Sequence, residues 1–509
     1  MNSAAAIAID EAALNRGAVT VFIMMATAMQ ALDTTIANVA LPDMQSSLGA
    51  AQDTIMWVLT SYIVAAAIMT PVTGWLSDRL GRKKLFLGSV VGFTISSALC
   101  GLATGLDEMV LFRLFQGVFG AALVPLSQAV LLDINPKERH GQAMAMWGAG
   151  IMVAPIIGPT LGGWLTDNFN WRWVFYINVP VGIIAFVGMW AFLPNTPLRR
   201  RRFDIVGFAL LSMAVGAFQL LLDRGQEQDW FGSMEIWMES GVALAGLWMF
   251  LIHTFTKEDP FVNPQMFKDR NLVVGLVFIF CVGIVLLATL ALLPPMMQSL
   301  YEYPIMTTGL VLAPRGMGTM AAMLMVGRLV QRVDARLLIL GGLGLTALSL
   351  WDMAGFSPQM GSWEFVASGV VQGLGLGFIF VPLSTVTFTT IEPQFRTEAT
   401  SLYSLMRNLG SSLGVSIMAT LLAQNTQINH VQLAAKMTPF NPMLAQAGID
   451  PATAAGALQL DAMVNQQAAM IAYLNDFKLM MWMTLAVAPL LLLMARPKKA
   501  KAAEAVVME

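Results

Sequence analysis

Residues 271–293, NLVVGLVFIFCVGIVLLATLALL, contain no charged side chain. As a helix rising about 1.5 Å per residue, this stretch would measure roughly 35 Å, more than the roughly 30 Å hydrocarbon core of a bilayer. Of the 509 residues, 57% are hydrophobic and 12% are charged, and this charged share is about half that of a typical soluble domain. The sequence therefore predicts an integral membrane protein.

Apolar stretches of spanning length occur fourteen times, and few segments alternate as β-strands do. They lie near residues 18–40, 55–77, 84–106, 108–132, 141–165, 171–193, 204–222, 236–256, 271–293, 304–328, 335–355, 363–389, 398–423 and 476–495. With the N-terminus in the cytoplasm, the inner segments carry 22 lysines and arginines and the outer segments three. Because cytoplasmic loops are enriched in these residues, we expect an all-α membrane protein whose two termini are both cytoplasmic.

Several classes of protein are disfavoured. A net charge of −2 gives no reason to expect a nucleic-acid ligand. Cys100 and Cys281 lie in apolar runs, and the three histidines share no ligand spacing, so neither a disulfide nor a metal site is expected. No Gly-Lys dipeptide occurs, which excludes a Walker phosphate loop. Gly410-Ser-Ser-Leu-Gly414 matches a hydrolase motif only by its letters, because it lies in a predicted helix. We expect no enzyme and no cofactor.

Two parts of the chain repeat each other. Gln116-Gly117 precedes Pro125-Leu126-Ser127, and Gln372-Gly373 precedes Pro382-Leu383-Ser384 at nearly the same spacing. The repeat predicts two six-helix bundles around a central cavity, with two further helices inserted between them. The expected units are a cytoplasmic segment 1–17, a bundle 18–193, an insert 204–256, a bundle 271–495 with a periplasmic segment 424–475, and a cytoplasmic tail 496–509.

Several motifs resemble the major facilitator superfamily. The loop from Gly74 to Lys84, GWLSDRLGRKK, resembles the loop signature of that family, and Gly158-Pro159 with Gly162-Gly163 resembles its exporter motif. LDTTIANVALP at 32–42 resembles the first-helix signature of its fourteen-span drug:proton antiporter branch. The segments 222–231 and 439–442 resemble inner-membrane pumps of three-part Gram-negative efflux systems. The resemblance implies a major facilitator fold and proton-driven export.

The resemblance also suggests roles for individual residues. Asp33 and Arg113 are expected at similar depths in the outer half of the membrane, where a charge is costly and usually functional. Burial opposes the charge of the acid while arginine favours it, so Asp33 can exchange a proton when its surroundings change. The alternative is a fixed structural ion pair.

Two glycine-rich motifs have both structural and functional interpretations. The resemblance implies a latch between the bundles at Gly74, Asp78, Arg79, Gly81 and Arg82, although the basic residues also serve topology. Gly158, Pro159, Gly162 and Gly163 form a helix-bending motif that equally supports close helix packing. The second-half loop carries Gln331 where the first-half loop carries Asp78, so the latch role is assigned to the first half only.

Polar residues within spans are candidates for the substrate cavity. They are Asn38, Tyr62, Gln116, Gln128, Arg315, Gln372 and Arg407. The arginines within spans outnumber Asp33, the one acid placed there, so we expect a preference for lipophilic organic anions. Alternatively, Arg315 and Arg407 bind backbone carbonyls near Pro314 and Gly410.

The outer segment 424–475 is too long for a hairpin loop, and its residues after Pro451 have helical character. The resemblance implies that it docks a periplasmic membrane-fusion adaptor, which leads to an outer-membrane channel, with Leu458, Met463 and Met470 as contacts. A solvated cap is the alternative.

Together these observations predict a proton-driven exporter of amphipathic drugs or toxic compounds in a bacterial inner membrane. A proton-coupled importer or facilitator of one metabolite, and a receptor without flux, are the alternatives.

Overall fold

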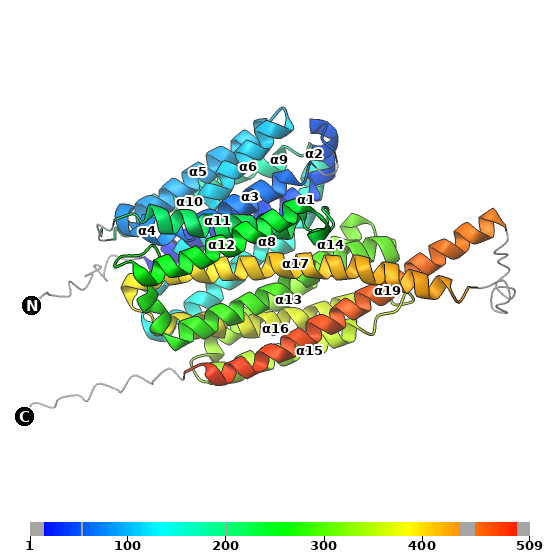
Figure 1. The fold of residues 1–509 in the computed structure, drawn as a ribbon. Helices are drawn as coiled ribbons and strands as arrows, with labels where there is room; N and C mark the ends of the chain where they lie inside the picture. Colours follow the sequence, from blue (N-terminus) through cyan, green and yellow to red (C-terminus); the bar gives the residue numbers. More distant parts are fainter. Residues whose placement is uncertain (1–14, 52–53, 197, 199–201, 438–452, 496–509) are drawn as a thin grey trace, which may run out of the picture.

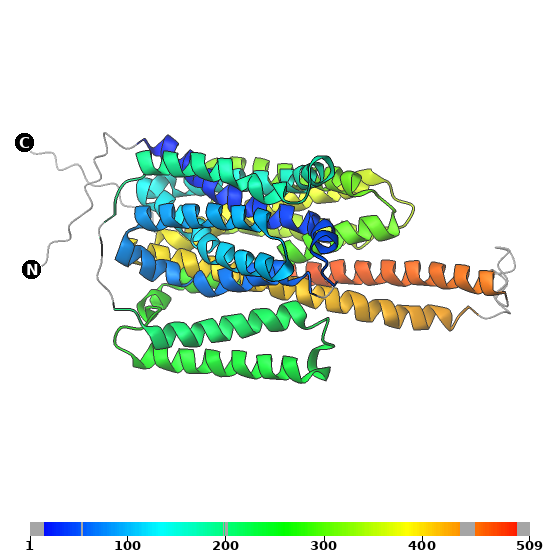
Figure 2. The ribbon, with the colours of Figure 1, turned by 90° about the horizontal axis from the view of Figure 1, so that it is seen from above.

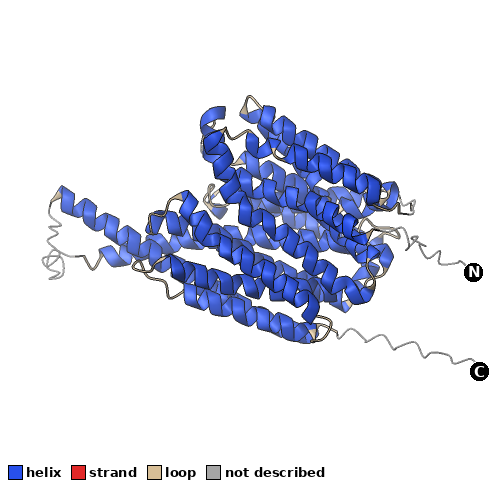
Figure 3. Cartoon of the chain, turned by 180° about the vertical axis from the view of Figure 1, so that it is seen from behind, coloured by secondary structure: helices blue, strands red, loops and turns tan. Residues whose placement is uncertain are grey.

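The computed structural model describes residues 15–51, 54–196, 198, 202–437 and 453–495. The predicted terminal segments before residue 15 and after residue 495 lie outside these ranges, as does Pro439-Phe440-Asn441-Pro442. Throughout the described residues the regular structure is helical, as Figure 3 shows, so the predicted all-α class is confirmed.

The chain forms two helical bundles and a separate helical pair (Figures 1 and 2). The first bundle contains α1 (Arg16–Val39), α2 (Leu41–Leu48), α3 (Trp57–Met69), α4 (Val72–Leu80), α5 (Arg82–Leu102), α6 (Leu106–Gly120), α7 (Leu123–Ile134), α8 (His140–Asn168), α9 (Trp173–Tyr176) and α10 (Asn178–Phe192). The pair is α11 (Ile205–Arg224) and α12 (Met234–Thr256). The second bundle contains α13 (Arg270–Leu300), α14 (Ile305–Leu329), α15 (Ala335–Met353), α16 (Ser362–Thr389), α17 (Arg396–Ala434) and α19 (Ala454–Val487).

The number of membrane crossings is compatible with fourteen. Among the described residues, twelve helical segments are long and apolar enough to span, and α3 with α4, bent by 59°, forms a further span. The remaining predicted span, 398–423, lies within α17 but contains five serines and two glycines. Buried residues of α17 such as Ser401, Ser404 and Ser411 explain why its hydropathy is low although it lies inside the bundle.

Two helices extend well beyond the predicted membrane spans. α17 continues to Ala434 instead of ending near residue 423, and α19 begins at Ala454, well before residue 476. No proline or glycine interrupts residues 415–434, so nothing in the sequence stops the helix where the apolar run ends. The two helices run beyond the bundle as a protruding hairpin, at the end opposite to the start of α1 (Figures 1 and 2).

The inserted pair packs against both bundles. Gln219 of α11 donates a hydrogen bond to Ser412 of α17 at 2.9 Å, and Gly216 faces Ile68 of α3. Asp204, the N-cap of α11, joins the pair to the chain that follows α12, because it accepts hydrogen bonds from Lys257 at 2.8 Å and from the Phe261 N–H at 2.9 Å. Burial opposes the ionisation of Asp204, but these hydrogen bonds outweigh it and hold its pKa at about 2.

Candidate functional site

Asp33 and Arg113 form the centre of a buried polar network in the first bundle. Both side chains are about 1% exposed, and Nη1 of Arg113 lies 2.6 Å from Oδ2 of Asp33. The other carboxylate oxygen, Oδ1, accepts hydrogen bonds from the side-chain amides of Gln116 and Asn178, each at 2.8 Å. Helices α1, α6 and α10 thus contribute to one site.

The guanidinium of Arg113 has further partners besides the carboxylate. Its Nε donates to the Val58 carbonyl at 3.0 Å, and its Nη1 also donates to Oε1 of Gln116 at 2.7 Å. The ring of Tyr62 lies 4.4 Å from the guanidinium carbon, a cation–π distance. Gly117 permits this approach of α6 to α3, because a Cβ there would overlap the Tyr62 carbonyl.

This network can stabilise the ionised form of Asp33 although the side chain is buried. It can also allow the carboxyl group to separate from Arg113 when Asp33 is protonated. Ion pairs this deeply buried are stable only when every charged atom is hydrogen-bonded, and here both oxygens of Asp33 have donors. Arg113 already has two neutral acceptors, so it would keep partners if Asp33 became protonated. The network is therefore suited to proton exchange coupled to a change in conformation.

Asn178 is the member of the site that sequence reasoning missed. It follows α9 and begins α10, and it also donates to Ser97 at 2.9 Å. Nothing in the sequence pattern indicated which residue of α1 Asn178 meets. A polar side chain within the predicted span 171–193 was the available signal.

Residues of the predicted latch lie where the two bundles meet. Gly74 packs against the backbone of Glu398 on α17, where an added Cβ would lie 3.2 Å from its Cα. Gly81 ends α4 with a φ of 84°, a left-handed conformation that favours glycine. Nε of Arg82 donates to Thr397 of α17 at 3.0 Å. Asp78 is half-buried in the last turn of α4, and Arg79 is exposed.

A carboxylate not singled out in the sequence links these elements. Asp133, at the end of α7, forms an ion pair with Arg82 and a second one with Arg396 of α17, whose Nη1 lies 2.6 Å away. Thr400 of α17 adds a hydrogen bond to the Pro125 carbonyl of α7 at 3.0 Å. In this structure the two bundles are thus joined at the end predicted to be cytoplasmic.

The second-half loop also crosses between the bundles, through a weaker contact. Nε2 of Gln331 donates to the Glu138 carbonyl at 3.3 Å. This amide–carbonyl contact replaces the charged contacts of the first-half loop, because Gln331 carries no charge.

The glycines of the helix-bending motif mediate close packing. α8 remains one continuous helix of 29 residues, with Pro155 and Pro159 inside it. Gly158 lies against Thr35 and Gly162 against Ile36, both on α1, while no atom lies within 4 Å of a Cβ built on Gly163. Packing against the helix that carries Asp33 is therefore visible, and bending stays a prediction.

The candidate cavity residues do not form a single site. Tyr62 and Gln116 belong to the Asp33 network, whereas Asn38 is exposed near the end of α1. Gln128 is fully buried, and neither polar atom of its amide has a partner within the described residues. Gln372 donates to Thr289 at 3.3 Å.

Two arginines lie in the second bundle. Arg315 is 5% exposed, its Nη2 donates to the Leu286 carbonyl at 3.3 Å, and its Nη1 has no partner within the described residues. Nη2 of Arg407 lies 3.4 Å from the side chain of Asn408. The contacts of Arg315 are thus with α13 rather than with a carbonyl near Pro314.

Besides Asp33, a second acid is deeply buried, and it lies in the second bundle. Asp476 is 1% exposed, and its Oδ2 has no partner within the described residues. The predicted span began at this residue, but α19 starts 22 positions earlier, so Asp476 lies in mid-helix. The excess of positive charge is therefore smaller than the sequence suggested.

The repeat relates the two bundles residue by residue. Gln372 contacts Thr289 on α13, just as Gln116 contacts Asp33 on α1. An added Cβ at Gly373 would overlap the Arg315 carbonyl, just as one at Gly117 would overlap that of Tyr62. Thr289 thus occupies the position of Asp33, and Arg315 occupies that of Tyr62. At the position of Asp33, therefore, the second bundle carries a neutral hydroxyl in place of a carboxyl group.

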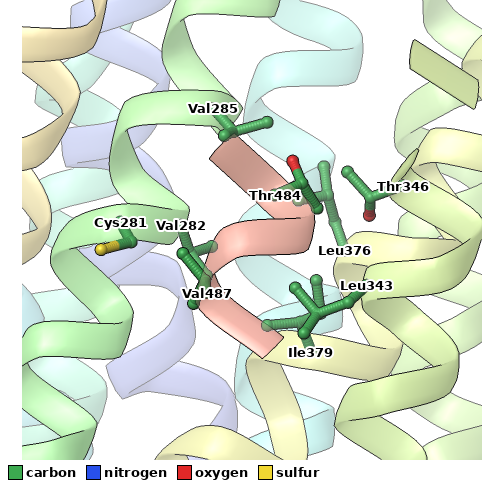
Figure 4. Close-up of a pocket in the computed structure, with 9 residues that line it drawn as sticks. All are labelled: Cys281, Val282, Val285, Leu343, Thr346, Leu376, Ile379, Thr484 and Val487. Carbon is green, nitrogen blue, oxygen red and sulfur yellow. The ribbon is translucent and has the colours of Figure 1, made fainter. Parts of the chain in front are cut away.

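A small pocket lies in the core of the second bundle. Figure 4 shows a pocket between α13, α15, α16 and α19, lined by residues such as Cys281 and Thr346. Its volume of about 10 Å³ is at the limit for one water molecule. This pocket is too small for a substrate.

Comparison with known proteins agrees with the fold and the motifs. The model of the Major Facilitator Superfamily matches residues 23–424, and the chain belongs to this family of membrane transporters. It is 37% identical to the Multidrug export protein EmrB of Escherichia coli (strain K12) over 429 residues, 83% of each chain. It is also 37% identical to the Fatty acid resistance protein FarB of Neisseria gonorrhoeae over 428 residues, 84% of each.

A solved structure shares the fold at low sequence identity. The human organic anion transporter MFSD10 (TETRAN) superposes with a TM-score of 0.60 at 14% identity, covering 92% of this chain and 99% of that one. The predicted major facilitator fold and the resemblance to EmrB-type efflux pumps are thereby confirmed.

Replacing Asp133 with asparagine tests the link between the bundles. Asp133→Asn removes the carboxylate shared by Arg82 and Arg396, so the closed end should open more often. A cysteine at Thr400, which is fully buried, should then react about tenfold faster with a membrane-impermeant maleimide in inside-out vesicles. Asp269→Asn, which alters only the cap of α13, should leave the rate unchanged. Equal rates in both variants would contradict a closing role for Asp133.

Proposed function

We propose that the chain is a proton-driven exporter of amphipathic drugs or toxic compounds in a bacterial inner membrane. The printed names of its relatives support export, since EmrB is a multidrug export protein and FarB a fatty acid resistance protein. Proton coupling is supported by the buried pair of Asp33 and Arg113. The corresponding position in the other bundle is occupied by Thr289, which is neutral.

The mechanism follows from where the polar contacts lie. The Asp33 network joins helices within the first bundle, whereas the Asp133 link joins the first bundle to the second. Proton uptake at Asp33 from the outer side would break the ion pair between α1 and α6, leave Arg113 bonded to Gln116 and Val58, and favour substrate release. Loss of the proton to the cytoplasm would restore the pair. A ligand shifts such an equilibrium only by binding one state better than the other.

Replacing Asp33 with asparagine should abolish uphill transport while leaving the protein folded. Asp33→Asn keeps the shape of the side chain but cannot carry the exchanged proton. In proteoliposomes, a substrate should then release no protons, and a proton gradient should accumulate no substrate. Asp223→Asn, which changes a half-buried acid of the insert, is the matched control and should retain both activities.

The same preparation distinguishes the alternatives. Everted vesicles given an inward proton gradient should concentrate an exported dye, whereas an importer would not, and a receptor would bind the dye without flux. Accumulation at the parental rate by Asp33→Asn would refute proton coupling through this acid.

We also propose that lipophilic organic anions are preferred substrates. The support is Arg315, a buried cation whose Nη1 has no partner within the described residues and which lies beside α13. The buried acid Asp476 weakens the argument from net charge, so the proposal depends on this one unpaired group rather than on an excess of arginines.

Comparing two substrates tests the anion proposal. The parent should export a lipophilic weak acid faster than a lipophilic cation, and Arg315→Gln should lower export of the acid about tenfold, as expected for a lost charged hydrogen bond. Export of the cation by Arg315→Gln should stay within twofold of the parent. A parental preference for the cation would end this proposal.

The protruding hairpin supports a tripartite assembly with a periplasmic adaptor and an outer-membrane channel. Its exposed apolar side chains are Ile428, Val431, Leu458 and Met463, each more than half exposed. Met470 was predicted as a contact, but it is 3% exposed and packs in the core of the second bundle, so it is withdrawn as a docking residue.

Polar substitutions on the hairpin test docking without deleting it. Changing Ile428, Val431, Leu458 and Met463 to glutamine removes the exposed apolar surface and should abolish co-purification of the adaptor. A control variant with Gln427, Gln432 and Gln459 changed to serine alters exposed positions of the same hairpin and should co-purify normally. Adaptor binding by the glutamine variant at the parental level would favour a solvated cap.

A further inference from the structure

A crevice of about 280 Å³ opens on the first bundle, between the end of α3, α4, the start of α5 and the junction of α6 with α7. Two helix breaks create it. α3 and α4 diverge by 59°, and the α6–α7 helix is interrupted at Ala121 and Ala122, so the helices cannot pack along their full length. In Figure 1, α5 and α6 lie along the outer edge of this bundle.

The walls of the crevice are apolar and its mouth is basic. Met69, Leu80 and Phe119 contribute apolar side chains, and Gly88 leaves space between them. Lys84 also lines the crevice and is exposed, one helical turn from Gly88 towards the predicted cytoplasmic surface. For comparison, an apolar cavity of about 150 Å³ is large enough to take up benzene.

The surface around the crevice is suited to lipid rather than to water or protein. Leu80 is 43% exposed and Phe119 37%, and further along α5 Val91 and Ile95 are 38% and 56% exposed. Such a continuous apolar stripe on a spanning helix faces acyl chains. The crevice lies inside one bundle, so it is separate from the interface between the bundles.

We propose that this crevice binds one anionic phospholipid of the inner-side leaflet, with an acyl chain between α4, α5 and α6 and the phosphate at Lys84. The charge of Lys84 complements the phosphate, and basic residues at the cytoplasmic surface attract anionic lipids by about 1 kcal/mol each. The lipid would lie near Arg82, which donates a hydrogen bond to Thr397 of the second bundle. The proposal does not depend on the direction of transport or on proton coupling.

The two halves of the chain provide a matched pair of substitutions. No atom lies within 4 Å of a Cβ built on Gly88 or on Gly341, and both residues are exposed. Gly88 is the seventh residue of α5 and Gly341 the seventh residue of α15. Gly88→Leu therefore adds a side chain to the crevice lining with no described atom in the way of its Cβ, and Gly341→Leu makes the same change at a residue that does not line this crevice.

Native mass spectrometry of the purified full chain tests the site. After mixed phosphatidylglycerol and phosphatidylethanolamine are added in detergent, the parent and Gly341→Leu should retain one tightly bound phosphatidylglycerol. Gly88→Leu should lose it. Lys84→Gln should retain it about fivefold more weakly, whereas Lys268→Gln, at another exposed lysine, should behave as the parent does.

Three results would overturn the proposal. Equal retention by Gly88→Leu and Gly341→Leu would place the lipid elsewhere. Equal retention of phosphatidylglycerol and phosphatidylethanolamine, unaffected by Lys84→Gln, would refute recognition of an anionic headgroup. Displacement of the lipid by an exported dye in proportion to its concentration would make the crevice a substrate site instead.

Discussion

The structure depends on a charged pair kept away from water. Two ions transferred from water to a hydrocarbon environment cost several kcal/mol each unless geometry and hydrogen bonds compensate. Here Gln116 and Asn178 satisfy the carboxylate of Asp33, and the Val58 carbonyl satisfies Arg113. Four helices, α1, α3, α6 and α10, must therefore keep fixed relative positions for as long as Asp33 is ionised. A proton on Asp33 would remove that requirement, and this is the physical basis of the proposed proton coupling.

The two bundles share a backbone plan but differ in the charges at related positions. Gln116 and Gln372 occupy the same place, and so do the glycines that follow them. The acid at Asp33 becomes Thr289, and the ring of Tyr62 becomes the guanidinium of Arg315. A repeated fold thus separates two tasks, because a neutral hydroxyl cannot exchange protons at physiological pH and a permanent cation attracts anions. Under the proposed function, proton exchange would belong to the first bundle and anion recognition to the second.

Any movement that separates the two bundles at one end must also be compatible with these buried contacts. The bundles meet through ion pairs and hydrogen bonds at one end, where Asp133 joins Arg82 to Arg396. The side chains of these ion pairs are 8–18% exposed, so water can reach them more easily than the Asp33–Arg113 pair, which is about 1% exposed. The Asp33 network lies within one bundle, and its charged pair is about 1% exposed. In the proposed mechanism the link between the bundles would open and close, and the network within the first bundle would change only when Asp33 gains or loses its proton.

The linear sequence determined the class of fold, because the hydropathy pattern gives the length of each apolar span. The distribution of lysine and arginine predicts on which side of the membrane each loop lies. The sequence also placed Asp33 and Arg113 at similar depths, since the helical rise converts residue number into distance along the membrane normal. Rotation about each helix axis and the choice of neighbouring helix are set by packing, which depends on side chains far away in the chain. For this reason Asn178, Asp133 and Asp476 were missed, Met470 was assigned to the wrong surface, and the crevice beside Gly88 could not be foreseen. Only the tertiary structure decided which polar groups meet, because contacts between helices follow from their packing and not from their order.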